Sequence, residues 1–411
     1  MPHLKISNKK QNALIFLCWL MYTIAYLGRY SYNSNIKIIG EYFSQGKDAT
    51  GLVSSMFFFF YGAGQIINGL LCKRYNKRIM LSLSLIVSAI INLVIALGVH
   101  FTYFKFLWLL NGVSQSILWS SLILVLSENL DDQHLKKAIV VMSTCVPAGT
   151  FLAYGASALF STFTSYNASF LLAAVGMSVV GILWFFTETK VTCPTVKVTE
   201  KVGEQPKQKN KLASSLIVTI IIICVFAIIC NLVKDGLQTW TPDILGKKFT
   251  LPNSLSIMLT LLLPLVGVLG ATIAVKVQSI IKNYVVVLGV FFLLAGALLT
   301  AVILLMNVHW VPVIACMSIA FCMSQGMNNV ITSIAPLQLR DKINSGMITG
   351  VFNGCCYVGS TISGYGLGSL VESSGNWNVI FWLMVALCAI AAIVSLIYIL
   401  LSKRKPKQTN A

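Results

Sequence analysis

Residues 22–37 read YTIAYLGRYSYNSNIK and close the first long apolar segment of the chain. They carry one arginine, Arg29, which follows the uncharged run 13–27 and precedes no other charge until Lys37. An arginine at this depth cannot easily extend to either membrane face, and placing one near the bilayer centre costs roughly 2.5–3.5 kcal/mol on insertion scales. Arg29 therefore indicates a functional site inside a bundle of membrane-spanning helices.

The composition is that of a polytopic membrane protein. Of the 411 residues, 57% are hydrophobic and only 10% are charged. The core of a soluble domain does not use so much apolar sequence, whereas a helical membrane protein requires it. We therefore expect an all-α membrane protein embedded in a lipid bilayer.

The net charge of +18 indicates membrane topology more than it indicates a nucleic-acid partner. If the loops alternate sides and both termini share one side, that side holds 23 of the 30 Lys and Arg residues and the other side holds five. The remaining two, Arg29 and Lys234, lie inside apolar segments. This asymmetry follows the positive-inside rule and predicts cytoplasmic termini in a plasma or inner membrane. The basic loops favour anionic lipid head groups, and we expect no nucleic-acid partner.

Twelve apolar segments are each close to the ~20 residues that span the hydrocarbon of a bilayer. A polar stretch, residues 188–212, separates the sixth segment from the seventh and predicts a cytoplasmic linker between two six-helix halves, residues 1–187 and 213–411. The predicted spans are residues 13–36, 50–71, 79–99, 103–126, 137–162, 168–187, 213–235, 254–275, 284–305, 309–335, 344–370 and 376–401.

The two halves repeat weakly. Residues 27–29 (LGR) match residues 232–234 (LVK) at an offset of 205, and Gly62 matches Gly267 at the same offset. Residues 153–155 (AYG) match residues 364–366 (GYG) at an offset of 211. An internal repeat of six helices is common in secondary transporters, whose substrate sites lie between the repeats near the middle of the membrane.

The repeat predicts one cation at the same position of each half, Arg29 and Lys234. Two cations that face one cavity form a site for an anion, and a guanidinium group binds phosphate oxygens in a bidentate way. The alternative for Lys234 is a structural pair with its neighbour Asp235. Consecutive helical residues point about 100° apart, which argues against that pair. The sequence thus favours ligand binding by both cations.

Hydroxyl and amide side chains flank the two cations and are candidates to line the same cavity. Tyr22, Tyr26 and Arg29 are spaced i, i+4, i+7 and share one helix face. Near the end of the segment, Tyr30 or Tyr32 fits an interfacial aromatic belt. The predicted lining residues are Tyr22, Tyr26, Tyr61, Gln65, Gln115, Trp119, Asn231 and Tyr357.

Signals for other chemistry are weak. The 11 cysteines show no C-x-x-C or Cys/His spacing, so we predict no metal site, disulfide or cofactor. No phosphate loop and no nucleophile with a neighbouring base occur, which argues against an enzyme. Asp235 is the one acidic residue deep in an apolar segment, and the 4 histidines fall in the arm, loops or helix ends. The proton relays of pumps and symporters are therefore nearly missing.

Four stretches resemble a known family. They are Y-L-x-R at residues 26–29, K-D-G-x-x-x-W-T-P at 234–242, G-x-F-N-G-x-x-Y-x-G at 350–359, and a loop with Gly69, Arg74 and Arg78. The first three resemble the organophosphate–phosphate antiporters of the major facilitator superfamily, and the loop resembles a motif of the whole superfamily. The resemblance implies the major facilitator fold of twelve helices, alternating access, and exchange of a phosphorylated metabolite for inorganic phosphate. It also implies that Arg29 and Lys234 bind phosphate.

Three functions follow as hypotheses. The first is a monomeric antiporter that exchanges a sugar phosphate or similar organophosphate for inorganic phosphate. The second is a proton-coupled carrier of an organic anion such as a sugar acid, with Asp235 as the possible proton or ion-pair site. The third is a transporter-like sensor that binds sugar phosphate and signals to a partner through residues 188–212.

Overall fold

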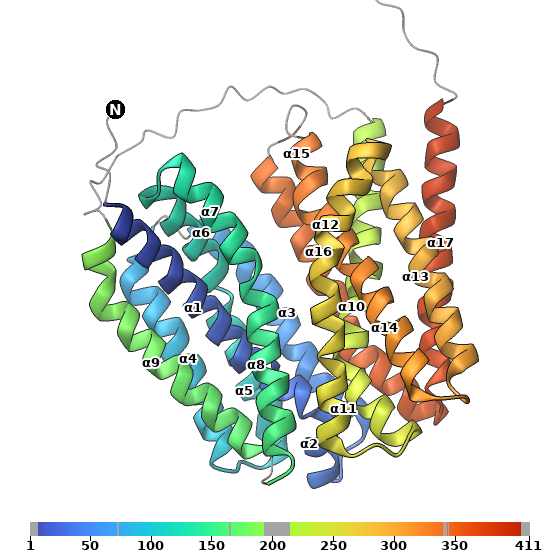
Figure 1. Cartoon of the computed structure of the whole chain (residues 1–411), viewed down its shortest axis with the longest axis horizontal. Coiled ribbons are helices and arrows are strands. Elements are labelled where there is room, and N and C mark those ends of the chain that lie inside the picture. The colour runs from blue at the N-terminus through green and yellow to red at the C-terminus, as the bar shows by residue number, and fades with distance from the viewer. Residues whose placement is uncertain are drawn as a thin grey trace, which may run out of the picture.

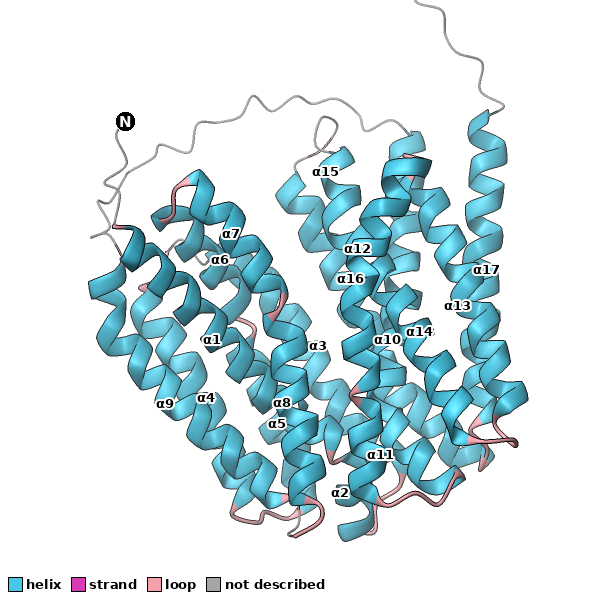
Figure 2. Ribbon diagram, viewed as in Figure 1, coloured by secondary structure: helices cyan, strands magenta, loops and turns pink. Residues whose placement is uncertain are grey.

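A computed structural model describes residues 7–71, 74–163, 166–192, 214–339, 343 and 345–403. These residues form a bundle of helices (Figure 1), and Figure 2 shows only helices and connecting loops in them. The prediction of an all-α protein is thus confirmed.

The first group of helices contains α1 to α9 and the second contains α10 to α17. The first group is α1 (Asn8–Ser34), α2 (Ile36–Tyr42), α3 (Lys47–Leu71), α4 (Lys77–Ala96), α5 (Phe101–Gln115), α6 (Leu118–Asn129), α7 (Asp132–Ser143), α8 (Cys145–Phe160) and α9 (Asn167–Val191). The second group is α10 (Ser214–Lys248), α11 (Asn253–Thr260), α12 (Leu262–Ile281), α13 (Tyr284–Leu305), α14 (Trp310–Asn329), η1 (Val330–Ile334), α15 (Ala335–Leu339), α16 (Ser345–Ser374) and α17 (Asn378–Lys403).

Eleven helical segments of the described residues are long and apolar enough to span a membrane. The remaining predicted span, residues 344–370, corresponds to α16, a helix of 30 residues whose glycine and serine content lowers its hydropathy. α16 packs along α3 and α10. Each of the twelve predicted spans therefore corresponds to helical structure, although several are divided between consecutive helices.

The fourth predicted span, residues 103–126, is one of these interrupted paths. α5 ends at Gln115 and α6 begins at Leu118. At the break, Ser116 Oγ donates to the Val113 carbonyl at 2.6 Å and accepts from Asn68 Nδ2 of α3 at 2.9 Å. The Ser116 hydroxyl thus links the break to its own backbone and to α3.

The seventh predicted span, residues 213–235, is too short, because α10 continues to Lys248 with Pro242 inside it. A proline removes one N–H from the helix and leaves the carbonyl four residues earlier without its partner. That carbonyl belongs to Gln238, and it accepts a hydrogen bond from Tyr154 OH of α8 at 2.8 Å. A side chain of the first group thus supplies the hydrogen bond that this carbonyl of α10, the longest helix of the second group, lacks within its own helix.

The two groups meet mainly along α3 with α16 and α8 with α11. Figure 1 shows them diverging toward the end that carries the N-terminus, where α1 begins and α17 ends. At the opposite end, which we call the far end, Asn33 Nδ2 donates to Thr239 Oγ1 at 3.0 Å. There Lys37 Nζ also donates to Asn253 Oδ1 at 2.7 Å. The structure therefore has direct polar contacts between the groups toward the far end.

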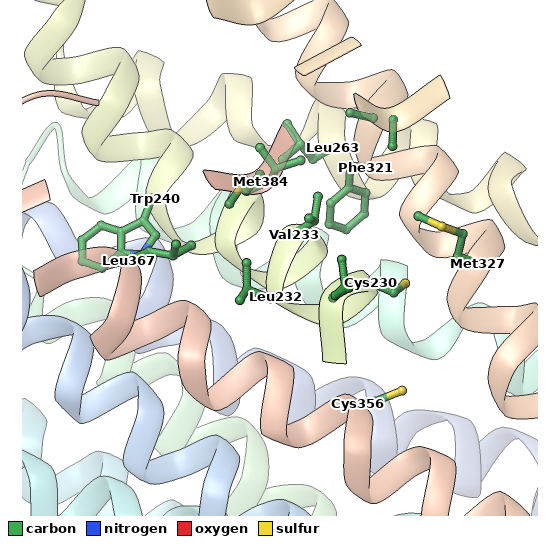
Figure 3. Close-up of a cluster of buried hydrophobic side chains, with 14 of the residues drawn as sticks. Cys230, Leu232, Val233, Trp240, Leu263, Phe321, Met327, Cys356, Leu367 and Met384 are labelled. Carbon is green, nitrogen blue, oxygen red and sulfur yellow. The ribbon is translucent and has the colours of Figure 1, made fainter. Parts of the chain in front are cut away.

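α10 lies in the middle of the larger hydrophobic cluster, part of which Figure 3 shows. Gly236 permits close packing, because a Cβ atom there would lie 2.6 Å from Leu367 Cδ1 of α16 and 2.8 Å from Met384 Cε of α17. These contacts fix the helix segment that carries Lys234 and Asp235.

The predicted linker cannot be compared in full, because residues 193–213 lie outside the described residues. α9 ends at Val191, within the predicted linker 188–212. The division into halves at these boundaries stays a prediction.

Candidate functional site

Arg29 of α1 is enclosed mainly by side chains of the first group of helices, with 3% of the residue exposed. Its guanidinium carbon lies 4.1 Å from the ring centre of Tyr61 and 4.2 Å from that of Tyr26. Nε donates to Gln115 Oε1 at 3.3 Å, whereas Nη2 is buried and finds no acceptor among the described residues. No described carboxylate lies within ion-pair distance of Arg29. A buried cation with unused hydrogen-bonding capacity is rare and marks a functional site.

The rings of Tyr26 and Tyr61 cover the guanidinium group, Tyr22 packs on Tyr26 and Tyr357 packs on Tyr61. We call these four residues the tyrosine cage: Tyr22, Tyr26, Tyr61 and Tyr357. The hydroxyl oxygens of Tyr22 and Tyr61 lie 3.2 Å apart, and the Tyr61 and Tyr357 rings are 4.9 Å apart. Tyr22 and Tyr26 meet edge to face at 5.1 Å, as expected for residues four positions apart on one helix. The structure thus brings together four tyrosines predicted from the sequence, from α1, α3 and α16.

Gln115 holds Arg29 from the side away from the cage. Its Nε2 donates to Ser88 Oγ of α4 at 2.9 Å and to Asn111 Oδ1 of α5 at 3.3 Å, and Ser88 Oγ also donates to Asn111. Because both of its polar atoms are used, Gln115 orients the guanidinium group. Ser88 and Asn111 were not predicted from the sequence. Their only signal is that they are polar residues within apolar spans.

The cage is linked to the second group of helices through α3 and α16. Gln65 Nε2 donates to Tyr61 OH at 2.8 Å, and Gln65 Oε1 accepts from Asn353 Nδ2 at 3.3 Å. A Cβ atom on Gly62 would lie 2.5 Å from Tyr357 Cβ, so only glycine allows this approach. Gln65 is therefore a bridge between the groups. Trp119, the remaining predicted lining residue of the first group, packs on Tyr22 at a ring distance of 4.8 Å.

Lys234 differs from Arg29 because it already has protein partners. Its Nζ donates to Asn231 Oδ1 at 2.7 Å and lies 3.6 Å from Asp235 Oδ1. The sequence argument against the Lys234–Asp235 pair is therefore wrong. Adjacent positions do point apart, but the four-carbon lysine chain is long enough for its ammonium group to reach a carboxylate held beside it.

Asp235 and Asn231 are in turn held by neighbouring helices. Ser360 Oγ of α16 donates to Asp235 Oδ2, and Asn231 Nδ2 donates to Asn328 Oδ1 of α14 at 3.1 Å. Side chains of Lys234 and Asp235 are 15% and 8% exposed. The predicted residues of the second group are thus brought into one polar cluster with α14 and α16.

Helix α16 contributes to both clusters. Tyr357 packs on Tyr61 in the tyrosine cage, and Ser360 Oγ donates to Asp235. One cation from each group of helices thus lies in a polar cluster to which α16 contributes, as expected of an anion site between two groups.

Two predicted features lie elsewhere. In the loop motif, Arg78 Nε donates to the Phe185 carbonyl at 2.6 Å and its guanidinium group covers that ring at 4.2 Å. Arg74 is exposed, and Gly69 lies near the end of α3. The interfacial prediction for Tyr32 is wrong. It is 0% exposed and its hydroxyl donates to the Thr50 carbonyl at 2.8 Å.

A second buried carboxylate in the spans was also not predicted from the sequence. Asp243 of α10 is 2% exposed and lies toward the far end of the helix, beyond the predicted boundary at residue 235. Among the described residues, no group of three His, Cys, Asp or Glu side chains is placed to hold a metal ion.

Residues 18–364 match the Major Facilitator Superfamily, and the chain belongs to this superfamily. It is therefore an integral, multi-pass membrane transporter and not an enzyme, as the sequence predicts.

Curated relatives are distant. Sugar phosphate exchanger 3 of Bos taurus is 21% identical over 407 residues, which cover 86% of this chain and 81% of the relative. The membrane sensor protein UhpC of Escherichia coli is 28% identical over 108 residues, which cover 26% of this chain. That match spans 24% of UhpC, about a quarter of its length.

Solved structures support the fold. A bacterial homolog of the human lysosomal transporter Spinster, in an inward-facing and occupied conformation, superposes with a TM-score of 0.75 at 15% identity and covers 99% of this chain and 100% of that one. A D-xylose–proton symporter gives a TM-score of 0.72 at 12% identity, covering 93% of this chain and 97% of that one. The predicted major facilitator fold is thus confirmed.

Proposed function

We propose that this transporter exchanges a phosphorylated small metabolite, such as a sugar phosphate, for inorganic phosphate by alternating access. The observation that carries the proposal is Arg29, a buried guanidinium group with an unpartnered Nη2 and no carboxylate near it in the described residues. Phosphate oxygens match the guanidinium fork, and charge-assisted hydrogen bonds of this kind are the strong ones.

The residues around Arg29 support an oxyanion more than an apolar or cationic substrate. The tyrosine cage offers hydroxyl donors, and Lys234 adds a second cation in a cluster that shares α16 with the cage. The relatives named sugar phosphate exchanger 3 and UhpC support the same class of substrate.

Exchange follows from the charges. An empty site leaves Arg29 unpaired in a buried position, which disfavours closure of the groups around it, whereas a bound anion compensates that charge. One anion can therefore replace another without a proton relay. We further propose a monomer in a plasma or inner membrane, with both termini and the 188–212 linker on the cytoplasmic side and the six-helix halves moving around the site.

A second candidate, proton-coupled transport of an organic anion, is favoured by the Lys234–Asp235 pair. Asp235 accepts a hydrogen bond from Ser360 and lies beside the cation it compensates, so protonation of Asp235 would free Lys234. Under this alternative, uptake depends on an imposed pH gradient and Asp235→Asn removes that dependence.

A third candidate is a membrane sensor of sugar phosphate, favoured by the UhpC match. A sensor binds the ligand but moves none across the membrane. Transport assays in proteoliposomes therefore distinguish a sensor, which binds without transport, from the two transporter candidates.

The test is counterflow into liposomes that contain unlabelled phosphate. We expect wild type to take up labelled phosphate and to release it when glucose 6-phosphate is added outside, with no effect of a pH gradient. Arg29→Ala should abolish uptake, and Lys248→Gln, which changes an exposed cation at the end of α10, should leave it unchanged. Wild-type liposomes that take up no phosphate, or an Arg29→Ala variant as active as wild type, would overturn the proposal.

A further inference from the structure

A polar cavity opens at the far end of the bundle. It has a volume of about 300 Å³ and lies between α2 and α3 of the first group and α10 and α16 of the second. None of its lining residues belongs to the Arg29 site. Its charged lining residues are Lys37, Glu41, Lys47, Asp243, Lys247 and Glu372.

The three lysines of this cavity have only long contacts with its carboxylates. Charge-assisted N–H···O bonds are usually about 2.7–2.9 Å long, shorter than these contacts. Lys37 Nζ also donates to Asn253 Oδ1 at 2.7 Å, but an ammonium group has three donors, so each lysine keeps capacity for another acceptor. The pairs are Lys37–Glu41 at 3.8 Å, Lys47–Glu372 at 3.5 Å and Lys247–Asp243 at 3.4 Å.

Asp243 is the unusual member of the set. It is 2% exposed, it lines the cavity, and neither carboxylate oxygen accepts a hydrogen bond within the described residues. Lys247 Nζ lies 3.4 Å from its Oδ1, and Lys37 and Lys47 line the same cavity. A buried carboxylate normally accepts hydrogen bonds, so Asp243 has two acceptor oxygens that a ligand's O–H groups can use.

We propose that this far-end cavity is a second binding site for a polyhydroxylated phosphate ester, the class of substrate assigned above to the Arg29 site. The lysines donate to the phosphoryl oxygens, and Asp243 and Glu372 accept from the hydroxyl groups. The inference rests on the proposed function for the identity of the ligand, but not for the existence of the site.

Because lysines and carboxylates both line the cavity, a ligand must carry an anionic group and hydroxyl donors to satisfy it. Inorganic phosphate satisfies the lysines but brings at most two O–H donors. Glu372 already accepts from the Lys47 backbone N–H at 2.9 Å, so Asp243 is the carboxylate that depends on a ligand rich in hydroxyl groups. A free sugar supplies O–H donors but no anion for the lysines. A sugar phosphate satisfies both. Unpaired buried polar groups are what make a site reject a ligand that lacks one of the two parts.

The site also touches the contact between the two groups of helices. Lys47–Glu372 joins α3 to α16, and it is the single ion pair between the groups among the described residues. A phosphoryl group on Lys47 competes with Glu372, so occupancy of the cavity weakens the closed far end. The cavity is thus placed to receive substrate from that side.

The experiment is equilibrium binding of labelled glucose 6-phosphate to purified full-length protein in detergent. We expect wild type to show a tight and a weaker class of site, and Arg29→Gln to keep only the weaker one. The double variant Lys247→Gln/Asp243→Asn preserves net charge and should lose about tenfold or more in affinity at the weaker site, the value of one charge-assisted contact. Lys248→Gln, in the same helix turn but outside the cavity lining, is the matched control.

A cysteine-labelling experiment tests the far-end site independently, in case the Lys247→Gln/Asp243→Asn variant folds poorly. Gln45 is exposed and lines the cavity, so Gln45→Cys should react with a membrane-impermeant maleimide. Glucose 6-phosphate should slow this reaction even when Arg29→Gln is also present, whereas equal concentrations of phosphate or glucose should not.

The outcomes separate the two proposals. If Arg29→Gln binds no glucose 6-phosphate and gives no protection of Gln45→Cys, the far-end site is wrong and the exchange proposal is untouched. If the double variant binds like Lys248→Gln, the far-end site is also wrong. If the weaker site persists but wild type exchanges no phosphate in liposomes, the exchange proposal fails and the far-end site stands.

Discussion

The two cations of the internal repeat occupy very different surroundings. Arg29 is packed against aromatic rings and one amide, and its Nη2 has no acceptor in the described residues. Lys234 has an amide at 2.7 Å and a carboxylate at 3.6 Å. The repeat predicted from the sequence thus places a positive charge in each group of helices, but the two charges are compensated differently. One group supplies a free cation and the other supplies a cation that is already neutralised.

This difference assigns unequal roles to the two groups. A ligand that binds Arg29 gains a new ion pair, whereas a ligand that binds Lys234 must compete with Asp235 for the same ammonium group. We infer that Arg29 supplies most of the binding free energy and that the Lys234–Asp235 pair adjusts it. Substitutions in each cluster should therefore have unequal effects.

Removing the positive charge of Arg29 should have the largest effect. Arg29→Gln loses two charge-assisted hydrogen bonds to a phosphoryl group, each worth about 1.5–3 kcal/mol, so phosphate exchange should fall by at least about 100-fold. Arg29→Lys should also be strongly impaired, because an ammonium group lacks the planar fork. Initial rates of counterflow measure both, with thermal unfolding as the check that the variants fold. An Arg29→Lys variant with wild-type rates would remove the case for bidentate binding.

Lys234→Gln should act mainly on stability. It leaves Asp235 buried without its cation, which typically costs about 3–5 kcal/mol. The double variant Lys234→Gln/Asp235→Asn removes both charges and should recover most of the thermal stability. If Lys234→Gln is as stable as wild type and merely fails to bind phosphate, Lys234 is an open cation like Arg29 and the asymmetry is wrong.

Gln115→Leu should have an intermediate effect through Arg29. It removes the acceptor that orients Nε, a hydrogen bond to a charged group worth about 1.5–3 kcal/mol. We expect apparent phosphate affinity to fall by about tenfold while the maximal exchange rate changes less. Gln65→Leu is a useful comparison, since Gln65 bonds to Tyr61 and not to Arg29. Equal losses from both variants would show that general disruption, and not orientation of Arg29, explains the result.

The repeat-matched tyrosines Tyr154 and Tyr365 offer a smaller test of the same kind. Tyr154 is 0% exposed and donates to the carbonyl that Pro242 frees, whereas Tyr365 is 48% exposed. Tyr154→Phe should lower stability by about 1 kcal/mol and Tyr365→Phe by less than about 0.5 kcal/mol. Thermal unfolding in detergent measures both variants. Equal effects would contradict the conclusion that the Tyr154 hydroxyl stabilises α10 through its hydrogen bond to the Gln238 carbonyl.

The smallest effect concerns Glu372 at the contact between the groups. The backbone N–H and the ammonium group of Lys47 lower the pKa of this carboxyl group. The ionised Glu372 carboxyl group therefore stabilises the folded protein fully above the ordinary glutamate pKa, about 4.3. This stabilisation is lost as pH falls through the lowered pKa of Glu372 in the folded protein. The thermal unfolding temperature of wild type should fall as pH drops through this range, and Glu372→Gln should remove that part of the fall. A pH response that persists in Glu372→Gln would assign it to another group.

Local patterns were sufficient to predict where the helical spans lie and that Tyr26 lies beside Arg29. The i, i+4, i+7 spacing places Tyr22 and Tyr26 with Arg29 on one face, and an isolated charge in an apolar span usually marks a functional site. The repeat then identified Lys234. Each of these inferences uses only spacing along one helix or the high free-energy cost of a buried charge.

Tertiary contacts decided what the sequence could not predict. Helix α10 continues through Pro242 because Tyr154, 84 positions away along the chain, satisfies Gln238. The Lys234–Asp235 pair depends on Ser360 holding the carboxylate. The internal repeat is a poor guide to packing, because the matched glycines have different neighbours. Gly62 packs on Tyr357 of the other group, whereas Gly267 packs on Phe321 within its own group.

The most direct test of the central claim is equilibrium binding of labelled inorganic phosphate to the purified wild-type protein, Arg29→Gln and Lys234→Gln/Asp235→Asn. We expect one tight site per wild-type chain, loss of that site in Arg29→Gln, and retained, weakened binding in the double variant. Tight phosphate binding to a folded Arg29→Gln variant would contradict the account.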